Sequence, residues 1–281
     1  MTPLIGIVTV LYNSEAVLPD FFASLNDQSY QPIVLYVVDN HSPDCALAVS
    51  SRLAETSRFR TVVIANSENY GVAKGNNIGI QRALGDGCDL VLLSNNDVTL
   101  EKDTIEKLLD GLIAHQADLA APKIYYAGTK QFWCAGGSFH KRSGLNLHRG
   151  LHQPDTGQYQ RDELMTFAPT CFLLIRRDVF EKVGLMDERY FVYWDDTDFV
   201  YRAVMKQHQT LWYIPASVVH HKEGTSTGVL SDFSIRFQYR NLVYFALKNY
   251  SRPYAEYVIV YNIALHIVRN LFRWPMAKWM L

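Results

Sequence analysis

The sequence predicts an α/β fold in which helices cover both faces of a mostly parallel sheet. In its first half, short runs rich in β-branched residues alternate with segments of helical periodicity. The runs are apolar almost throughout, which is typical of parallel strands buried on both faces. Because parallel neighbours need right-handed crossover connections, the alternation predicts a doubly wound sheet. We expect strands at residues 4–11, 33–39, 60–65 and 89–94, and helices near 15–28, 45–57, 71–84 and 101–114.

The second half of the chain is less regular. Residues 140–165 are polar and punctuated by glycine, without an apolar period, and predict a mobile or substrate-facing loop. The stretch CFLLIRRDVFEKVG predicts a buried strand that enters a helix ending at Gly184. After it we expect a helix near 197–206, a strand at residues 210–215 and a helical segment from about residue 232.

Charge is unevenly distributed along the 281 residues. The net charge is −1, so the total does not indicate a nucleic-acid-binding protein. From Phe233 onward, however, the chain has seven Lys and Arg residues and one acidic residue, Glu256. A basic segment on an acidic body indicates contact with an anionic surface such as lipid head groups.

The C-terminal stretch YAEYVIVYNIALHIVRNLFRW has the pattern of a helix with one narrow polar stripe. Such a helix packs into a core, packs against a partner, or lies in a membrane surface with Trp274 and Trp279 at the head groups. The basic excess favours an interfacial or partner-bound helix. The stripe consists of Asn262, His266, Arg269 and Arg273.

Three features that the sequence lacks predict the cellular compartment of the protein. The four cysteines form no CxxC pair, so neither a disulfide framework nor a zinc site is indicated, and a reducing cytoplasm is favoured. The N-terminus lacks a basic region and a cleavage site, so we expect no signal peptide. No apolar stretch approaches the ~18–20 residues that span a bilayer. We expect a cytoplasmic protein, soluble or peripheral on the inner face of the cell membrane.

Ligands of doubly wound sheets bind beyond the carboxyl ends of the strands, so the residues that follow each strand are candidates. Asp39 follows the second strand, where it either accepts hydrogen bonds from a base or ribose or simply ends the strand in a turn. Asp97 closes the sequence SNND after the fourth strand. Its carboxylate is suited to a divalent cation that bridges two phosphates, although the same letters are also typical of an Asx-turn.

Residues 69–79, NYGVAKGNNIG, have glycine at every fourth position from Gly71. Glycine lets a backbone approach phosphates closely, but the spacing is equally typical of tight helix–strand packing. A dinucleotide fingerprint is disfavoured because it would follow the first strand and not the third. Lys74 and the amides of Asn76 and Asn77 would suit a nucleotide-sugar.

The most unusual stretch is YFVYWDDTDFVYR, residues 190–202, which packs three carboxylates between aromatic residues. Buried like charges are unfavourable unless a metal, a cation or a helix N-terminus compensates them. We expect Asp198 either to cap a helix or to pair with Arg202. A second candidate feature is the adjacent pair His220 and His221, since histidine can bind a divalent metal or a diphosphate oxygen.

In this order, the motifs resemble glycosyltransferase family 2, the inverting nucleotide-sugar enzymes with the GT-A fold. The resemblance covers roughly residues 4–245 and is closest to bacterial rhamnosyl- and galactofuranosyltransferases of surface polysaccharide synthesis. It implies a Rossmann-like GT-A domain over residues 1–230, with a nucleotide-sugar half to about 100, and a helical segment over 231–281. The motifs are VTVLYN, Asp39, NYGVAKGNNIG, LLSNNDV, CFLLIRRDVFEKVGLMDERYFVYWDDTDFVYR and PASVVHHKEGTSTG.

The resemblance also implies roles for residues at matching positions. Asp196 would be the catalytic base that takes the acceptor proton. Asp195 would bind acceptor hydroxyls, and Trp194 would offer a stacking face or belong to the core. Asp97 and His221, rather than His220, would hold Mg²⁺ or Mn²⁺. The donor would be bound by Thr9, Asn13, Asp39, Asn69, Lys74, Asn77 and Asn95.

One departure concerns the metal motif. The family has Asp-x-Asp at this position, but Asn95 replaces the first carboxylate, which removes a charge from the site. The resemblance implies transfer of L-rhamnose from dTDP-rhamnose to a glycan or lipid-linked acceptor. Galactofuranose, glucose or N-acetylglucosamine from a UDP-sugar stays open, as do a nucleotidyltransferase and a non-catalytic sugar-binding scaffold.

Overall fold

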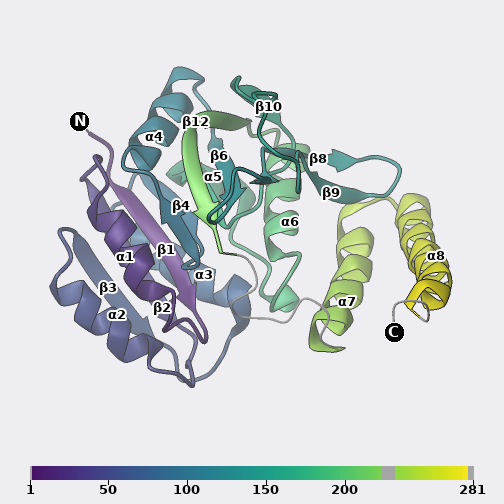
Figure 1. Cartoon of the computed structure of the whole chain (residues 1–281), viewed down its shortest axis with the longest axis horizontal. Coiled ribbons are helices and arrows are strands. Elements are labelled where there is room, and N and C mark those ends of the chain that lie inside the picture. Colours follow the sequence, from purple (N-terminus) through teal and green to yellow (C-terminus); the bar gives the residue numbers. More distant parts are fainter. Residues whose placement is uncertain (1, 223–231, 278–281) are drawn as a thin grey trace.

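The computed structural model describes residues 2–222 and 232–277, with side chains up to residue 268. It is an α/β structure with one large sheet and two long helices at one end (Figure 1). The predicted boundary between residues 230 and 231 lies outside the described residues, as do the side chains of Arg269, Arg273, Trp274 and Trp279.

The first half confirms the predicted doubly wound arrangement. Its strands are parallel neighbours in the order β3-β2-β1-β4. Helices α1, α2 and α4 pack on one face of the sheet, and α3 packs on the other. The elements are β1 (Ile5–Leu11), α1 (Leu18–Asn26), β2 (Ile33–Asp39), α2 (Ala46–Glu55), β3 (Arg60–Ala65), α3 (Gly71–Gly85), β4 (Leu90–Ser94) and α4 (Thr104–Ala114).

Beyond β4 the sheet becomes mixed. Strand β11 (Phe172–Arg176) is antiparallel to β4 and to β6 (Leu119–Tyr126). Strand β12 (Leu211–His221) runs parallel to β6. It continues past the predicted end at residue 215 through a register shift between Ile214 and Val218, so that the histidine pair becomes part of the strand. Strands β12 and β6 each pair with one further short strand. Strand β5 (Val98–Leu100) pairs with β12, and β7 (Phe132–Cys134) pairs with β6.

The prediction of an irregular loop at residues 140–165 was wrong for part of that segment. Strand β8 (Gly137–His140) and β9 (Leu145–His148) form an antiparallel hairpin, and β10 (Glu163–Met165) joins the edge of the sheet beside β12. Strands of three or four residues are too short to give a recognisable period, and their stability comes from neighbours distant in the sequence.

The predicted strand and helix before Gly184 are confirmed as β11 and α5 (Arg177–Val183), and Gly184 ends that helix with a positive φ of 78°. The next helix, α6 (Asp195–Val200), begins at Asp195 and not at the predicted residue 197. It continues as a π-helical turn over Tyr201–Lys206. A 3₁₀ turn at Glu188–Tyr190 precedes α6. Helices α5 and α6 cover the same face of the sheet as α3.

The C-terminal segment contains the predicted helices, α7 (Asp232–Asn249) and α8 (Arg252–Ala277). Helix α7 lies between α6 and α8 in Figure 1, and the two long helices share a small apolar cluster that includes Leu242 and Val258. Among the described residues, no helix combines the length and the apolar character needed to cross a bilayer.

Candidate functional site

Strand pairing brings Asp97 and His221 together. His221 is the last residue of β12 and pairs with Val98, the first residue of β5, so it lies beside the residue that precedes β5. Its Nε2 is 3.1 Å from a carboxylate oxygen of Asp97. His220 alternates to the other side of the strand, where its Nε2 is 3.5 Å from Glu101. The structure therefore separates the two histidines as the alternation of a strand requires.

The Asp97–His221 pair has an unsatisfied polar atom. His221 is 5% exposed, and its Nδ1 has no hydrogen-bond partner among the described residues. A carboxylate and an imidazole are both ligands for Mg²⁺ or Mn²⁺, so these two residues fit a divalent cation. The part of the chain that the structure describes holds no group of three or more His, Cys, Asp or Glu side chains placed to hold a metal. The remaining coordination positions would be open to water or to oxygen atoms of a bound ligand.

Cys171 pairs with the end of the fourth strand, and no sequence signal predicted a role for it. Its carbonyl accepts a 2.8 Å hydrogen bond from the amide of Asn95, because β11 and β4 are antiparallel neighbours. Burial raises the pKa of the Cys171 thiol well above its ordinary value, and the negative charges of Asp97 and Asp196 raise it further. Both carboxylates thus lie within electrostatic reach of one buried sulfur atom.

Asp195 and Asp196 open helix α6 as two neighbouring carboxyl groups, the first buried and the second half-buried. Burial, together with the charge of Asp196, raises the pKa of Asp195 to about 8. Burial also raises the pKa of Asp196, but the Thr197 amide at 2.6 Å and the charge of His148 oppose that rise. Two adjacent carboxyl groups in such a place do not readily ionise together, and the hydrogen bond from the Thr197 amide favours the charge on Asp196.

Asp198 confirms the predicted ion pair with Arg202. It is fully buried, and its carboxylate is 2.8 Å from Arg202 Nε and 2.8 Å from Lys248 Nζ. Asn249 and the Tyr190 hydroxyl also donate to it. Burial alone would raise the pKa of Asp198, but these cations and hydrogen bonds hold it below its usual value. Asp198 therefore joins α6 to α7.

The predicted nucleoside-binding residues lie near the carboxyl ends of β1 and β2. Thr9 is fully buried and Asp39 is 2% exposed, yet Thr9 Oγ1 and one carboxylate oxygen of Asp39 have no hydrogen-bond partner among the described residues. The other Asp39 oxygen accepts from the amide of Ser42 at 3.2 Å. Asn13 is exposed just after β1, with a positive φ of 54°. Buried polar atoms without partners are unusual and are candidates for contact with a ligand or an ordered water.

The glycines of residues 69–79 provide close packing of α3 on the sheet, the plainer of the two predicted interpretations. A Cβ on Gly75 would lie 2.8 Å from Val10, and one on Gly79 would collide with Val8. Asn69 accepts from the Gly71 amide at 2.9 Å and so forms the turn that enters α3. These contacts do not involve Lys74, which lies 3.8 Å from the centre of the Tyr70 ring.

Three further predicted residues have internal contacts. Asn77 Nδ2 donates to Met186 and Glu188, and its oxygen accepts from the Met186 amide, so a contact of Asn77 with a donor stays a prediction. Trp194 is partly buried, with its ring centre 5.2 Å from that of Phe245 and its Nε1 3.3 Å from Gln238. Asn95 is exposed after β4, next to the Asp97–His221 pair.

Comparisons with known proteins identify the family of the chain. The sequence model of "Glycosyl transferase family 2" matches residues 6–184. A "dTDP-rhamnosyl transferase RfbF" of Shigella flexneri is 26% identical over 70% of the chain, and the match spans 62% of that protein. An "N-acetylglucosaminyl-diphospho-decaprenol L-rhamnosyltransferase" of Mycobacterium tuberculosis is 28% identical over 81% of the chain and 79% of the relative.

Solved structures show the same fold. A mannosyltransferase from Pyrobaculum calidifontis, in complex with GDP-Man and Mn²⁺, superposes with a TM-score of 0.62 at 16% identity, over 95% of this chain and 70% of that one. Residues 1–349 of S. aureus TarS, in complex with UDP-GlcNAc, give a TM-score of 0.60 at 15% identity, over 91% of this chain and 70% of that one. At such identities the likeness concerns the fold alone.

Proposed function

The chain belongs to glycosyl transferase family 2, and on that premise we propose that it moves L-rhamnose from dTDP-rhamnose to a hydroxyl of a glycan or lipid-linked acceptor, with inversion. The product would serve the synthesis of a bacterial surface polysaccharide. The choice of rhamnose is supported by the names of the Shigella and mycobacterial relatives. The observation that carries the mechanism is the Asp97–His221 pair, 3.1 Å apart, whose His221 Nδ1 is buried without a hydrogen-bond partner among the described residues.

The nucleoside would occupy the carboxyl ends of β1 and β2. Thr9 Oγ1 and Asp39 supply two polar atoms that need partners, and base or ribose donors would satisfy the Asp39 oxygen. Asn13, at the protein surface, would cover the nucleoside on its solvent side. Asn69, Lys74 and Asn95 would then line the ribose and diphosphate, with Lys74 providing positive charge.

Asp97 and His221 would hold a divalent cation, Mg²⁺ or Mn²⁺, together with the donor diphosphate. When bound, the cation would act as a Lewis acid that neutralises the charge growing on the leaving group. Because Asn95 replaces a carboxylate, we expect these two side chains to bind the cation weakly without the donor.

Asp196 would act as the base. Its carboxylate would accept the proton of the acceptor hydroxyl while that oxygen attacks the anomeric carbon from the face opposite the diphosphate. The bond to the nucleoside diphosphate would break with its electron pair on the leaving oxygen, and the configuration would invert. Asp195, which retains its proton at neutral pH, would donate a hydrogen bond to the acceptor sugar, and Trp194 would border it.

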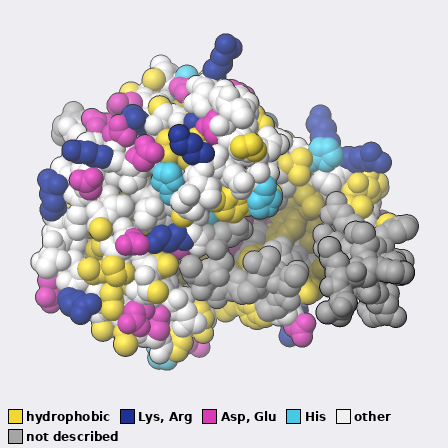
Figure 2. Space-filling model, in the orientation of Figure 1, with side chains coloured by type: hydrophobic (Ala, Val, Ile, Leu, Met, Phe, Trp, Pro, Cys, Tyr) yellow, Lys and Arg dark blue, Asp and Glu magenta, His cyan; other side chains and the backbone are white. Residues whose placement is uncertain are grey.

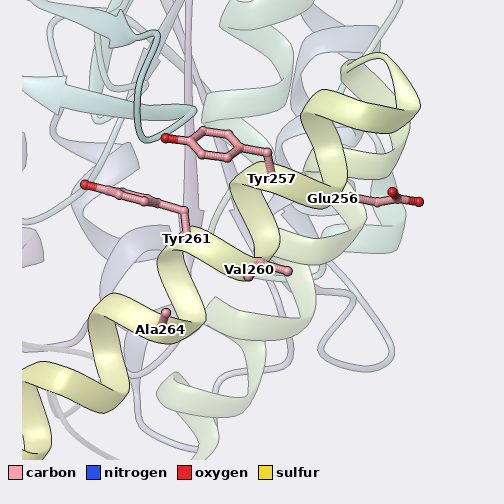
Figure 3. A pocket seen from close by; sticks show the side chains of 5 residues that line it. All are labelled: Glu256, Tyr257, Val260, Tyr261 and Ala264. Atoms are coloured by element: carbon pink, nitrogen blue, oxygen red, sulfur yellow. The ribbon is translucent and has the colours of Figure 1, made fainter.

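Helix α8 and the β8–β9 hairpin would contact an anionic membrane. Figure 3 shows the rings of Tyr257 and Tyr261 on the same side of α8, 5.7 Å apart between centres. Figure 2 shows basic, histidine and hydrophobic side chains gathered at this end of the molecule. Arg142 of the hairpin turn lies 6.0 Å from the Tyr261 ring centre. A lipid-linked acceptor, as in the name of the mycobacterial relative, would be presented at such a surface. Apolar residues exposed on α8 are Tyr257, Val260, Ile263, Ile267 and Val268.

A thermal-shift screen of nucleotide-sugars with and without Mg²⁺ or Mn²⁺ tests the donor. Because a ligand that binds only the folded state raises its stability, dTDP-rhamnose should raise the melting temperature more than UDP-sugars do. Transfer should then be followed with N-acetylglucosaminyl-diphospho-lipid as acceptor, and NMR of the product should show the inverted anomer. A larger shift with a UDP-sugar would mean that this nucleotide-sugar, and not dTDP-rhamnose, is the donor. If no donor releases a nucleoside diphosphate, a sugar-binding scaffold is favoured. Release of pyrophosphate would indicate a nucleotidyltransferase.

A further inference from the structure

The segment that leads into Asp195 has an unusual backbone. Phe191, Tyr193 and Trp194 have positive φ values of 63°, 60° and 70°. Large L-residues rarely adopt this left-handed conformation, because the Cβ approaches the backbone too closely. Three such residues within four positions persist only where the surrounding structure holds them. The segment therefore needs external contacts to keep its shape.

Asn241 of α7 supplies contacts of this kind. Its side chain is fully buried, and its Nδ2 lies 3.0 Å from the carbonyl oxygen of Tyr190, 2.8 Å from that of Val192 and 2.9 Å from that of Tyr193. The amide group has two hydrogens for three acceptors, so at least one hydrogen is shared. An aspartate of the same shape would have no hydrogen to donate.

Helix α3 holds the segment from the opposite side. The Val72 amide donates to the carbonyl of Phe191 at 2.5 Å, and a Cβ on Gly71 would collide with the same residue. Gly71 also has a positive φ of 81°. The segment is thus confined between the start of α3 and the buried amide of Asn241. α7 lies next to α6 in Figure 1.

We propose that Asn241 is a positioning residue that sets the place of Asp195 and Asp196 by fixing the carbonyls of the preceding segment. The inference rests on the proposed function, in which Asp196 is the base. It makes α7 a part of the catalytic unit although this helix follows the acidic residues in the chain and bears none of the residues assigned to the reaction. Without the amide, the segment can relax from its left-handed conformation, and the carboxylates that follow it shift.

The test compares Asn241→Ala and Asn241→Asp with the wild-type chain, using dTDP-rhamnose and N-acetylglucosaminyl-diphospho-lipid. We expect kcat to fall at least about 30-fold in both variants while the KM for dTDP-rhamnose stays within about threefold. The acid midpoint of the kcat–pH profile should also move, because the surroundings of Asp196 would change. Wild-type kcat and an unmoved midpoint in folded Asn241→Asp protein would overturn the inference. If neither variant folds, Asn241→Ser, which keeps one donor, decides by the same readouts.

Gln28→Ala is the matched control. Gln28 also has a buried side-chain amide, and its Nε2 donates to the carbonyls of Ser24 and Glu101 at 3.0 and 2.8 Å, neither of which is assigned to the reaction or to the membrane contact. Its loss should lower the melting temperature without moving kcat or the pH midpoint, which separates positioning from a general loss of stability. Asp196→Asn in the otherwise wild-type chain separates the two proposals. If Asp196→Asn still transfers the sugar, the assignment of Asp196 as the base is wrong. If Asp196→Asn loses transfer but the Asn241 variants keep wild-type kcat, only the positioning role of Asn241 is refuted.

Discussion

The Nε2 atom of His221 lies 3.1 Å from a carboxylate oxygen of Asp97, and the pairing of β5 with β12 holds the two residues at this distance. Asp97→Asn should remove cation-dependent stabilisation by dTDP-rhamnose and lower transfer by roughly 100-fold, because the leaving diphosphate loses charge compensation. His221→Gln should have a similar but smaller effect. Thermal shift with and without Mn²⁺ measures the cation-dependent stabilisation, and product formation measures transfer.

His220→Gln is the control for this pair. His220 is the neighbouring residue of the same strand, but its side chain lies toward Glu101. We expect its replacement to leave both the Mn²⁺-dependent shift and transfer close to wild type. Equal losses in the His220 and His221 variants would show that the effect comes from the strand and not from ligation.

The acidic pair predicts a bell-shaped pH dependence of kcat. Asp196 must be ionised to accept a proton, so activity should rise with pH through its raised pKa. Activity should fall again above about pH 8 as Asp195 loses its proton, since its pKa is raised to about 8. His148→Gln should move the acid limb to higher pH, because the charge of His148 lowers the pKa of Asp196. Asp195→Asn should remove the alkaline limb, and a limb that persists would refute this assignment.

Stability should change with pH in a related way. A carboxyl group whose pKa is raised in the folded state stabilises the fold below its unfolded pKa, near 3.8, and loses that contribution as pH rises through the folded pKa. Asp195→Asn should therefore be increasingly stabilising, relative to wild type, between about pH 4 and pH 8. Urea unfolding at several pH values measures the difference. The exposed Asp110→Asn on α4 is the control for the loss of a surface carboxyl group.

Thr9→Val tests the nucleoside site. Valine has nearly the shape of threonine and removes a buried hydroxyl that has no partner among the described residues, so stability should be equal or slightly higher. If the hydroxyl contacts the donor, the affinity for dTDP should fall by roughly 5- to 10-fold, measured by calorimetry. Thr61→Val on β3 is the matched control, because Thr61 Oγ1 is also a buried atom for which the described part of the chain supplies no hydrogen-bond partner. Equal affinities in wild type and Thr9→Val would remove Thr9 from the donor site.

Lys248 joins α7 to the segment around the acidic residues. Its Nζ is 2.8 Å from Asp187 and 2.8 Å from the fully buried Asp198, and it helps lower the pKa of both. Lys248→Met should reduce the free energy of unfolding at pH 7 by about 2–3 kcal/mol, because buried carboxylates lose a cation. Carboxylates with a lowered pKa stabilise the fold above about pH 3.8, and this contribution is lost as they become protonated in acid. The free energy of unfolding of the variant should therefore fall less steeply than that of wild type as the pH is lowered.

The control for Lys248 is Arg252→Met. Arg252 forms a surface pair with Glu256 in which both side chains are more than half exposed. Its loss should change the free energy of unfolding by less than about 0.5 kcal/mol. A change at position 248 as small as at position 252 would show that Arg202 alone compensates Asp198.

Membrane contact by α8 is tested by co-sedimentation with vesicles of phosphatidylglycerol and phosphatidylcholine. Val260→Glu combined with Ile267→Glu places charge on the exposed apolar face, which is 66% and 52% exposed at these residues, and should abolish binding. Ile113→Glu on α4, where the side chain is 50% exposed, should leave it unchanged. Binding that is equal for all three proteins would refute the membrane contact.

Much of the fold could be predicted because the first half has strong local signals. Runs such as IVLYVVD at β2 are apolar and bounded by turn residues, so their identity as strands does not depend on distant contacts. The short strands β8, β9 and β10 could not be predicted, because three or four residues carry no period. Cys171 was missed for a related reason: a lone cysteine acquires meaning only when antiparallel pairing places it beside Asn95.

The sequence by itself determined the parallel half of the sheet and the resemblance to the family, because these depend on composition and spacing along the chain, whereas the close packing of Gly75 and Gly79 was decided only by the structure. Tertiary structure alone decided that the histidine pair belongs to β12, that Thr197 and His148 oppose the rise in the pKa of Asp196, and that Asn241 holds the segment before the acidic residues. Those outcomes depend on strand alternation, burial and hydrogen bonds between residues far apart in the chain, and none of these has a local signal.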